Sequence, residues 1–494
     1  MSMIQVTNLT FAYDGSYDTI FENVSFQLDT NWRLGFTGRN GRGKTTFLKL
    51  LLGQYEYSGS ISASVDFDYF PYQIKDDTRL TSAIIEELCP EAEEWQVLRE
   101  LSLLQVDETV LERSFNTLSN GEQCKVMLAS MFLKENNFML IDEPTNHLDA
   151  EGRASVSQYL KRKRGYILVS HDRAFLDDCV DHILSINKTN IEIQKGNFSS
   201  WWSNKQLQDQ YELAENEKLK HDIKRLNEAS KQTNHWSHEV EKTKNGSHNS
   251  GSKVDRGYVS HKAAKMMKRS KVLEKRQQNA IEEKSKLLKN VEASVPMKMT
   301  PLVYHKHQLV ELNCVSIHYG EKQVTHDISF SIEQGDRIVI TGKNGSGKSS
   351  LLKLIYGEPL SYSGTLQIAS QLRMSYVSQQ TAHLQGNLKD YARNEGLDEA
   401  LFKSLLRKLD FSRDQFEKDM KHFSGGQKKK VLIAKSICEP AHLYIWDEPL
   451  NFIDVLSRMQ IEEVLLDYEP TLLFVEHDRV FSDKIATKHV ELDS

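Results

Sequence analysis

Cysteine and long apolar runs are the two features that this sequence most clearly lacks. The 494 residues contain five cysteines, an odd and scattered set that fits a reducing compartment and forms no metal-ligand cluster: Cys89, Cys124, Cys179, Cys314 and Cys438. No apolar run approaches the roughly 20 residues that span a bilayer. Residues 1–5 have neither a charged leader nor the apolar core of a signal peptide. Together these absences predict a cytoplasmic protein that does not insert into a membrane.

The net charge of −6 is small but unevenly distributed along the chain. Residues 201–300 carry 21 Lys and Arg against 13 Asp and Glu, whereas the rest of the chain carries 42 against 56. A basic segment within an acidic protein predicts a polyanionic partner for that segment. The length is sufficient for roughly three domains.

One glycine-rich stretch carries the chemistry of the N-terminal part. It follows a strand-like run, 33–37, precedes an apolar helix start, 46–52, and reads Gly38-Arg39-Asn40-Gly41-Arg42-Gly43-Lys44-Thr45. Strand, glycine loop, Lys-Thr and helix form the arrangement that binds nucleotide phosphates. The glycines let backbone N–H groups face the phosphate oxygens, and the helix N-terminus adds positive potential. We expect Lys44 to reach the β- and γ-phosphates and the Thr45 hydroxyl to ligate Mg²⁺.

The loop recurs about 300 residues later, together with its neighbours. The second copy follows a strand-like run, 337–341, and reads Gly342-Lys343-Asn344-Gly345-Ser346-Gly347-Lys348-Ser349. Three further pairs of residues keep nearly the same offset as the loop lysines. The offset is 304 residues for Lys44 and Lys348, 305 for Ser119 and Ser424, 305 for Glu143 and Glu448, and 306 for His171 and His477. A shared order at a nearly constant offset indicates a tandem duplication.

The duplicated motifs resemble those of the ATP-binding cassette ATPases, over roughly residues 1–200 and 305–494. Besides the two loops, the resemblance rests on segments 118–123 and 423–427, 138–144 and 443–449, and 169–173 and 475–479. It implies an α/β fold class, with two tandem P-loop nucleotide-binding domains that each carry Walker A, Walker B and a signature motif. It also implies a monomer whose two cassettes close head to tail on two ATP molecules.

The resemblance assigns roles to individual residues. Apolar runs before the two Walker B aspartates predict buried parallel strands, whose C-terminal ends are where α/β sheets bind ligands. The implied Mg²⁺ ligands are Thr45, Asp142, Ser349 and Asp447. The implied catalytic residues, which polarise the attacking water or face the γ-phosphate, are Glu143, Glu448, His171 and His477. The implied nucleotide-binding residues are Tyr13, Gly38, Asn40, Gly41, Gly43, Lys44, Thr45, Thr46, Gln73, Ser119, Gly121, Glu122, Tyr319, Gly342, Asn344, Gly345, Gly347, Lys348, Ser349, Ser350, Gln379, Ser424, Gly426 and Gln427.

Some of these assignments have alternatives. Tyr13 and Tyr319 precede the loops at the place where the family stacks an aromatic ring on adenine, and the alternative is an ordinary core tyrosine. Gln379 matches the family's Q-loop glutamine. The first cassette has one residue more in segment 69–73, so Gln73 is the preferred but ambiguous counterpart.

The signature and D-loop motifs would act across the cassettes. Ser119 and Ser424 are expected to open helices whose N-termini can bind the γ-phosphate held by the opposite cassette. The first D-loop reads Asn146-His147-Leu148-Asp149. The second reads Asn451-Phe452-Ile453-Asp454, and the two departures leave its cross-site hydrogen bonding open.

The segment between the cassettes, residues 201–304, has the composition of a charged helical linker. Apolar residues three or four apart in its first part and seven apart in its second part predict a two-helix hairpin, with a loop near 245–252. The basic tip is about 232–262, and residues 242–276 contain eleven Lys and Arg against two acidic residues. Aromatic residues are interleaved with these charges, which suits contact with folded RNA rather than simple tethering of the cassettes.

Two cassettes with a charged linker of about 100 residues and no membrane span resemble the ABC-F family of translation factors. Within this family, the sequence resembles the antibiotic-resistance branch, in particular Lsa-type proteins. Three features carry this resemblance: the long linker, the first cassette without an inserted arm and the absence of a C-terminal coiled coil. The resemblance implies ATP-dependent binding to the tRNA exit site of the ribosome. The linker would contact 23S rRNA and the P-site tRNA and reach toward the peptidyl-transferase centre, where lincosamides, streptogramin A and pleuromutilins bind.

Three alternatives are weighed against ribosome protection. A housekeeping ABC-F factor would bind ribosomes without conferring resistance. The ATPase of an efflux system has no use for a basic hairpin. A chromosome or repair ATPase would split one cassette across its coiled coil, whereas both cassettes here are complete.

Overall fold

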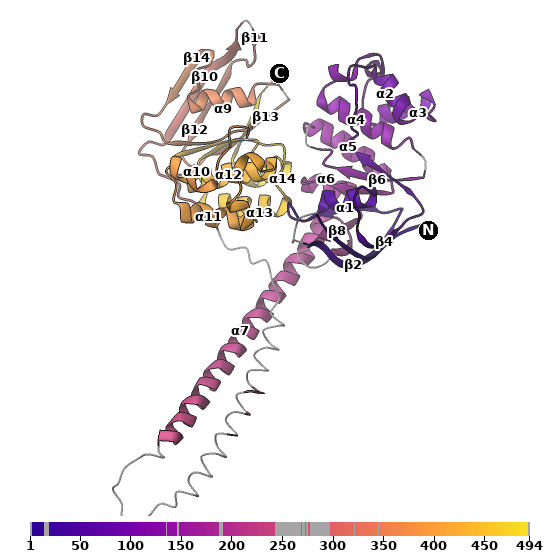
Figure 1. The fold of residues 1–494 in the computed structure, drawn as a ribbon. Helices are drawn as coiled ribbons and strands as arrows, with labels where there is room; N and C mark the ends of the chain where they lie inside the picture. The colour runs from indigo at the N-terminus through magenta and orange to yellow at the C-terminus, as the bar shows by residue number, and fades with distance from the viewer. Residues whose placement is uncertain are drawn as a thin grey trace, which may run out of the picture. The chain divides into compact units, whose positions relative to one another are not determined.

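The computed structural model describes residues 2–13, 19–134, 136–145, 148–186, 191–242, 268, 272, 275–276, 297–320, 322–343 and 345–492. The chain forms two units, one of residues 1–201 with 295–494 and one of residues 202–294. The first unit contains both cassettes, and many of their helices and strands are labelled in Figure 1. In the described ranges, no helix combines the length and apolar character needed to cross a membrane.

The first cassette is built on two sheets. The larger has the strand order β5-β6-β7-β3-β8-β9, in which only β9 runs antiparallel to its neighbour. Its strands are β5 (Asp66–Phe70), β6 (Asn137–Asp142), β7 (Tyr166–Val169), β3 (Arg33–Thr37), β8 (His182–Ile186) and β9 (Ile191–Lys195). The smaller sheet is antiparallel and consists of β2 (Thr19–Asp29), β1 (Met3–Ala12) and β4 (Ser58–Ser62).

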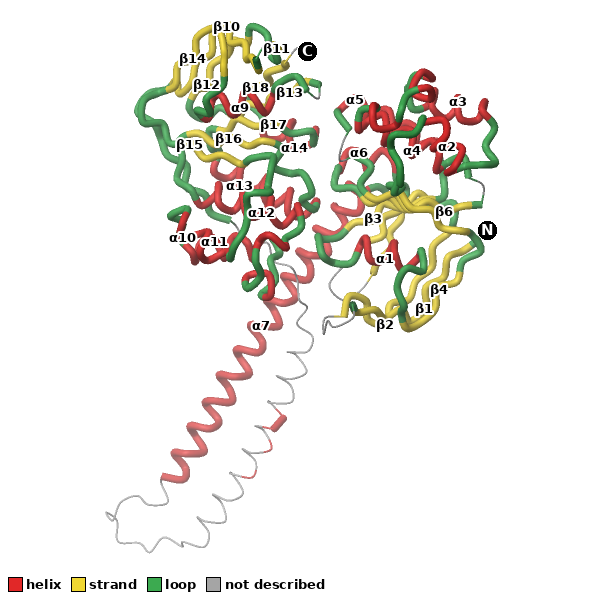
Figure 2. Tube along the Cα trace, turned by 45° about the horizontal axis from the view of Figure 1, so that its top comes forward, coloured by secondary structure: helices red, strands yellow, loops and turns green. Residues whose placement is uncertain are grey.

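The helices of the first cassette follow the predicted motifs. They are α1 (Lys44–Leu51), α2 (Thr81–Leu88), α3 (Glu94–Leu103), α4 (Asn120–Met131), α5 (Ala150–Arg162) and α6 (Arg173–Cys179), with short 3₁₀ turns η1 (Glu108–Glu112) and η2 (Phe115–Thr117). Apolar residues of α1 pack with those of β1, β3 and β6 in one core cluster. Figure 2 distinguishes these strands and helices by colour. Helix α1 is thereby held against the sheet, directly after the glycine loop.

The second cassette repeats this plan. Its parallel sheet has the order β15 (Met374–Val377), β16 (Leu443–Asp447), β17 (Leu472–Val475), β13 (Arg337–Gly342) and β18 (Lys488–Leu492). Its antiparallel sheet consists of β10 (Gln308–Tyr319), β11 (Lys322–Gln323), β12 (Ile328–Glu333) and β14 (Ser361–Ile368). Its helices are α9 (Lys348–Tyr356), α10 (Leu388–Asn394), α11 (Glu399–Lys408), α12 (Gly425–Cys438), α13 (Val455–Tyr468) and α14 (Arg479–Ile485), with 3₁₀ turns η4 (Asp414–Phe416) and η5 (Met420–His422).

The central parallel strands are buried along their whole length. Every residue of β7, β16 and β17 is buried, as expected for strands covered on both faces. The sequence therefore reads as continuous apolar runs at these strands rather than as alternation. Because these runs end at the Walker B aspartates and before the two histidines, the polar groups emerge together at the C-terminal edge of each sheet.

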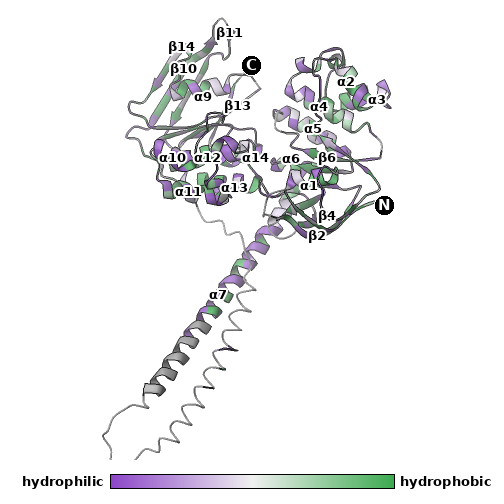
Figure 3. Cartoon of the chain, viewed as in Figure 1, coloured by the Kyte–Doolittle hydropathy of each residue, from purple (hydrophilic) through white to green (hydrophobic). Residues whose placement is uncertain are grey.

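The described part of the linker is helix α7 (Phe198–Lys242), which confirms the first helix of the predicted hairpin. Its 45 residues correspond to a length of roughly 65 Å at 1.5 Å per residue. The coloured part of α7 in Figure 3 is mainly hydrophilic, and Leu207 and Tyr211 are exposed. The predicted second helix and the loop at 245–252 lie almost entirely outside the described residues.

The C-terminal boundary of the linker differs from the predicted residue 304. Residues 297–304 belong with the cassettes, because Met297 and Met299 are buried in the core of the second cassette and Tyr304 packs in its second core cluster. The alternating methionines bury apolar side chains that a solvated linker would expose. Residues 297–304 are therefore part of the fold of the second cassette.

A buried ion pair anchors the second D-loop to α12. Lys430 Nζ donates to Asp454 Oδ2 at 2.7 Å and to the Leu409 carbonyl at 2.8 Å. Burial alone would raise the pKa of Asp454, but Lys430 outweighs it and holds that pKa below its usual range. Asp454 also accepts from the Ser457 backbone N–H and caps α13, so the pair joins two helices and the loop between them.

We predict that Lys430→Met lowers the free energy of unfolding by about 3–5 kcal/mol, because it leaves the Asp454 carboxylate buried without a cation. Lys125→Met changes the equivalent position of the first cassette, where the lysine is only half-buried. It should cost less than about 1 kcal/mol. Chemical denaturation of the two variants measures the difference, and equal losses would contradict the assignment.

Candidate active site

The two glycine loops adopt matching conformations at the ends of β3 and β13. Lys44 Nζ donates to the Gly38 carbonyl at 2.6 Å, and Lys348 Nζ donates to the Gly342 carbonyl at 2.8 Å. Glycine is required before each lysine, because Gly43 and Gly347 have φ of 94° and 87°. Each lysine is thus held over a glycine-lined loop at a helix N-terminus, as a phosphate site requires. Asn344 lies outside the described residues, so its predicted role stays a prediction.

A hydroxyl and a carboxylate meet beside each loop. Thr45 Oγ1 donates to Asp142 Oδ2 at 3.0 Å, and Ser349 Oγ donates to Asp447 Oδ1 at 3.0 Å. Burial raises the pKa of Asp142, and it raises the pKa of Asp447 to about 6. A buried carboxylate with a raised pKa favours a nearby cation, and hydroxyl and carboxylate oxygens are the donors that Mg²⁺ takes beside nucleotide phosphates. The four residues therefore fit the expected Mg²⁺ sites, where the metal would neutralise phosphate charge.

The two predicted catalytic glutamates follow the Walker B aspartates in a left-handed backbone conformation. The φ of Glu143 is 53° and that of Glu448 is 45°. His171 Nε2 lies 3.3 Å from Glu143 Oε1, and His477 Nε2 lies 3.6 Å from Glu448 Oε1. Each cassette therefore brings its glutamate and histidine together, as a pair that could orient a water molecule.

The electrostatic surroundings of the two glutamates differ. Burial, and then the charge of Asp142, raise the pKa of Glu143 to about 8. Burial would also raise the pKa of Glu448, but His477 and the amide of Gln379 outweigh it and lower that pKa to about 2. The surroundings therefore shift the pKa values of the two glutamates in opposite directions. The two sites are similar in geometry but differ in their electrostatic surroundings.

The Q-loop glutamine is placed clearly in the second cassette only. Gln379 Nε2 donates to Glu448 Oε2 at 2.8 Å. Gln73 is exposed, and its assignment stays a prediction. The residue at the same distance from the matched strand is Tyr72, whose hydroxyl donates to Asp68 instead. The first cassette therefore lacks a glutamine at the position that corresponds to Gln379.

The signature serines cap helices as predicted. Ser119 is the N-cap of α4 and forms a capping box with Glu122. Ser424 is the N-cap of α12 and forms the same box with Gln427. These reciprocal hydrogen bonds satisfy the first backbone donors of each helix and fix its N-terminus. Contact of Ser119, Gly121, Glu122, Ser424, Gly426 and Gln427 with nucleotide stays a prediction.

One cavity joins the signature of the first cassette to the Walker A loop of the second. Its volume is about 1030 Å³. It is lined from one side by Ser119, Gly121, Glu122, Leu148 and Asp149, and from the other by Gly345, Gly347, Lys348, Ser349, Ser350, Gln379, Glu448 and His477. This is the head-to-tail arrangement predicted for the second nucleotide, and the cavity is large enough for one.

A direct hydrogen bond joins the cassettes at the other site. Asn40 Nδ2 of the first Walker A loop donates to the carbonyl of Phe452 in the second D-loop at 2.8 Å. The backbone of Phe452 adopts a φ of 63°, and its carbonyl also approaches Gly426 at the start of α12. The second D-loop thus bridges the loop of one cassette and the signature of the other, despite its departures from the family motif. Asn146 and His147 of the first D-loop lie outside the described residues.

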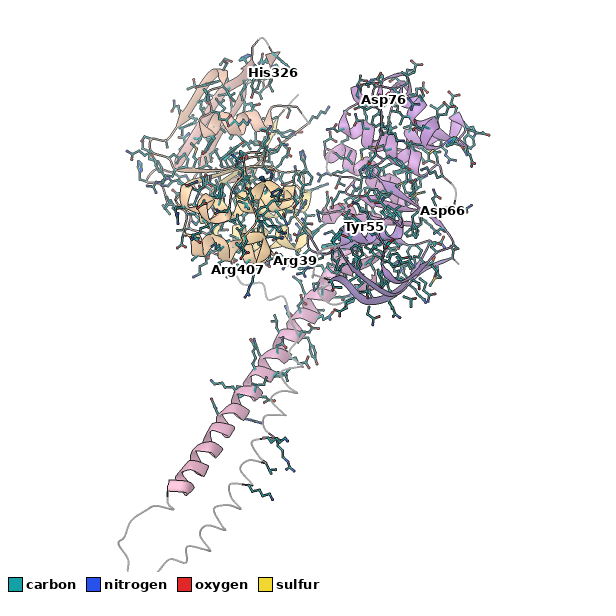
Figure 4. The ribbon with its side chains drawn as sticks, in the orientation of Figure 1. Arg39, Tyr55, Asp66, Asp76, His326 and Arg407 are labelled. Atoms are coloured by element: carbon teal, nitrogen blue, oxygen red, sulfur yellow. The ribbon has the colours of Figure 1, made fainter. Side chains whose placement is uncertain are left out.

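The two predicted adenine-stacking tyrosines have equivalent environments. Tyr13 is 41% exposed and its hydroxyl lies 2.7 Å from Thr46 Oγ1. Tyr319 is 48% exposed and its hydroxyl lies 3.2 Å from Ser350 Oγ. Tyr55, labelled in Figure 4, packs edge-on against the Tyr13 ring. Both hydroxyls contact the first turn of the Walker A helix and both residues are exposed, so adenine stacking stays a prediction consistent with their placement.

The contacts of two arginines beside the D-loops were not predicted from the sequence. Arg153 Nη1 donates to Asp172 Oδ2 at 3.0 Å and to the carbonyl of His477 at 3.0 Å. Arg458 Nη1 donates to Asp478 Oδ2 at 3.0 Å. The signal that could have revealed them is their shared position, four residues after each D-loop aspartate.

A protein-family model described as "ABC transporter" matches residues 21–146 and 325–451, slightly more than half of the chain. The chain belongs to the ABC transporter family. Both matched ranges contain a Walker A loop and a strand that ends in a Walker B aspartate. Domains of this family bind and hydrolyse ATP, which indicates ATPase activity for this ABC ATPase.

Relatives of this ABC ATPase align along almost the whole chain. It is 28% identical over 495 residues to "Ribosome protection protein VmlR" of Bacillus subtilis (strain 168), covering 97% of this chain and 85% of VmlR. It is 28% identical over 553 residues to "Putative ATP-binding protein YdiF" of the same strain, covering 100% and 80%. It is 26% identical over 489 residues to "ATP-binding protein Uup" of Caulobacter vibrioides (strain ATCC 19089 / CIP 103742 / CB 15), covering 96% and 75%.

Solved structures share the fold of this ABC ATPase at lower identity. One is titled "Crystal structure of the complex of archaeal ribosomal stalk protein aP1 and archaeal ribosome recycling factor aABCE1", with a TM-score of 0.64, 18% identity and coverage of 99% of this chain and 87% of that one. Another is titled "RNase-L Inhibitor", with a TM-score of 0.63, 18% identity and coverage of 99% and 88%. The prediction of two tandem ABC ATPase domains of the α/β class is confirmed.

We predict that Gly426→Ala destabilises the nucleotide-free protein by about 1–3 kcal/mol, because a Cβ there would overlap the Phe452 carbonyl oxygen. Gly121→Ala is the matched control, since the nearest atom to its Cβ would be Leu148 Cδ2 at 3.7 Å. It should be neutral or slightly stabilising, because alanine favours a helix more than glycine does. Denaturant unfolding without nucleotide measures both, and the same change in both variants would refute the close approach at Phe452.

Proposed function

We propose that this ABC ATPase is an ABC-F type ribosomal protection protein. In its ATP-bound form it enters the tRNA exit site of a drug-stalled ribosome. The linker tip contacts 23S rRNA and the P-site tRNA and reaches toward the peptidyl-transferase centre, where it displaces the antibiotic. Hydrolysis at the two ATP sites then releases the protein.

The observation that carries this proposal is a long charged segment between two complete cassettes of one chain. Helix α7 alone has 45 residues, far more than a tether needs. The similarity to the Bacillus subtilis ribosome protection protein runs through this segment, since it covers 97% of the chain. The Lsa-type branch in particular, with lincosamides, streptogramin A and pleuromutilins as its drugs, is the finer part of this proposal.

The charge of the linker supports a nucleic-acid partner. Eleven Lys and Arg against two acidic residues between 242 and 276 supply phosphate contacts, whose affinity falls with salt because binding releases counterions. Most of this range lies outside the described residues, so its RNA contacts rest on sequence. The free energy of binding to rRNA would drive drug release directly or by favouring a drug-poor conformation of the pocket.

ATP serves as the clamp in this proposal. The contacts between the cassettes, such as Asn40 with the Phe452 carbonyl and the cavity between Ser119 and Lys348, are the surfaces that nucleotide would bridge. Closure around two nucleotides then presents the linker in the geometry that fits the ribosome. The ATPase therefore acts as a conformational switch, in which ATP binding and hydrolysis control binding to the ribosome.

A housekeeping role is the alternative that a specific observation favours. "Putative ATP-binding protein YdiF" is as similar to this chain as VmlR is, at 28% identity, and its name refers to ATP binding and not to ribosome protection. A housekeeping ABC-F factor would bind ribosomes in the same nucleotide state without changing drug susceptibility. Susceptibility testing of a strain that expresses the protein separates the two functions.

We predict that Glu143→Gln with Glu448→Gln traps the ATP-bound protein on ribosomes, because water can no longer be polarised for hydrolysis. Co-sedimentation with ribosomes in ATP should rise to the level seen for the wild type with a non-hydrolysable analogue, while ATP turnover falls by at least roughly a hundredfold. Glu108→Gln with Glu417→Gln, exposed glutamates in the same two cassettes, is the control and should behave as wild type. Free dissociation of the trapped variant would contradict the role of the two glutamates.

We predict that replacing residues 232–262 by a short flexible linker abolishes resistance but leaves ATP turnover within about twofold, because the ATP sites lie in the cassettes. Lys218→Gln with Lys220→Gln, which removes two exposed charges of α7 outside the tip, should keep resistance. Minimum inhibitory concentrations and phosphate release are measured side by side. Resistance that survives the tip replacement would refute the role of the tip.

A further inference from the structure

A tyrosine occupies the same position of the sheet in both cassettes. Tyr69 of β5 pairs with Leu140 of β6, and Tyr376 of β15 pairs with Ile445 of β16. Leu140 and Ile445 each precede the Walker B aspartate by two residues, so all these side chains share one face of the sheet. A tyrosine is long enough to reach diagonally from its own pair to the next residue on that face. Each tyrosine is thus directed at the carboxylate expected to hold Mg²⁺.

In the first cassette the tyrosine makes that contact. Tyr69 Oη donates to Asp142 Oδ2 at 3.0 Å, and the same oxygen accepts from Thr45 at 3.0 Å. The Tyr69 ring packs on the apolar core of the cassette, which fixes its direction. The carboxylate is therefore oriented by a rigid side chain from a neighbouring strand, and not by the Walker A hydroxyl alone.

In the second cassette the equivalent hydroxyl is available to a further partner. Tyr376 Oη is buried next to Asp447 but forms no hydrogen bond of normal geometry with the described residues, while Asp447 accepts from Ser349 at 3.0 Å. Its ring is held by stacking on Tyr356, with ring centroids 4.9 Å apart. Leaving a buried hydroxyl without a partner costs about 1–3 kcal/mol, so a further interaction is favoured there.

Tyr376 lines a cavity of about 360 Å³. The lining of this cavity also includes the two expected Mg²⁺ ligands of this cassette, Ser349 and Asp447, and the Q-loop glutamine Gln379. The site is both polar and large enough to hold water. A small reorientation of the Asp447 carboxylate would let it accept from the tyrosine.

Both tyrosines can donate a hydrogen bond, because a phenol is protonated at physiological pH. A protonated phenol donates one hydrogen bond, which stabilises a carboxylate in its ionised form. An ionised, oriented carboxylate is the form that holds a divalent cation.

We propose that Tyr69 and Tyr376 are positioning residues that orient the Walker B carboxylates and so strengthen Mg²⁺ binding at both ATP sites. They act through Asp142 and Asp447 and do not touch the reacting phosphate. Hydrogen-bond partners of metal ligands commonly contribute about 10–100-fold to metal affinity. This inference rests on the ATP sites of the family and is independent of ribosome binding.

The test compares Tyr69→Phe, Tyr376→Phe and the double variant in the full-length protein. Phenylalanine keeps the ring and its packing and removes only the hydroxyl. Binding of a fluorescent ATP analogue is titrated with Mg²⁺, and separately measured in EDTA. The double variant should need about 10-fold more Mg²⁺ for half-saturation, each single variant should shift one of two binding phases, and affinity in EDTA should stay unchanged.

Tyr356→Phe is the matched control. It removes one hydroxyl from a tyrosine that stacks on Tyr376 and lines the same cavity, but that belongs to α9 and not to β15. It should leave the Mg²⁺ titration unchanged. Unaltered half-saturation in the double variant, or an equal loss of affinity in EDTA, would overturn the proposal and assign the hydroxyls a purely structural role. Denaturant unfolding of each variant shows whether it is folded. If the double variant is destabilised, the Mg²⁺ titrations of the two single variants are compared with the wild type instead.

Discussion

The constraint on which the two sites depend is the parallel register of the Walker A and Walker B strands. Strand β7 lies between β3 and β6 in the first cassette, and β17 lies between β13 and β16 in the second. This register brings a hydroxyl at the start of one helix to within 3.0 Å of a carboxylate nearly one hundred residues away, twice in the same chain. A shift of one residue in β6 or β16 would turn its carboxylate to the other face of the sheet.

The two sites share this scaffold but not their charge balance. Glu448 is surrounded by donors from Gln379 and His477, whereas Glu143 is buried beside Asp142 and opposite the second D-loop. A nucleotide with its metal would bring positive and negative charge to both sites at once. Because the starting states differ, the free energy released on binding need not be the same at the two sites, even though the sequence motifs repeat.

The elements predicted from sequence follow from strong local signals. The glycine loops, the strands that end in Asp142 and Asp447 and the helices capped by Ser119 and Ser424 each combine a periodic apolar pattern with a fixed chemical marker. The contacts that escaped prediction are those between segments far apart in the chain. Tyr69 and Asp142 are 73 residues apart, and only the sheet register shows that they meet.

The linker boundary illustrates the same limit. Residues 297–304 are short, lie next to a charged segment and carry no periodic pattern, yet two methionines bury their side chains in the second cassette. Their composition predicts a linker, because composition alone does not show which side chains are buried in the core of a distant segment. The ambiguous glutamine of the first cassette has a similar cause, since one additional residue at a strand end changes which side chain faces the site.

The hydrogen bond from Asn40 to the second D-loop has a consequence for how this motif can change over time. Asn40 is bound by the main-chain carbonyl of Phe452, and the aromatic side chain takes no part in the bond. Replacement of the side chain at 452 therefore leaves the acceptor in place as long as the backbone keeps its left-handed turn. This contact therefore tolerates substitutions of the side chain at 452. It is sensitive to substitutions that the left-handed backbone conformation excludes, such as proline, whose φ is fixed at about −65°.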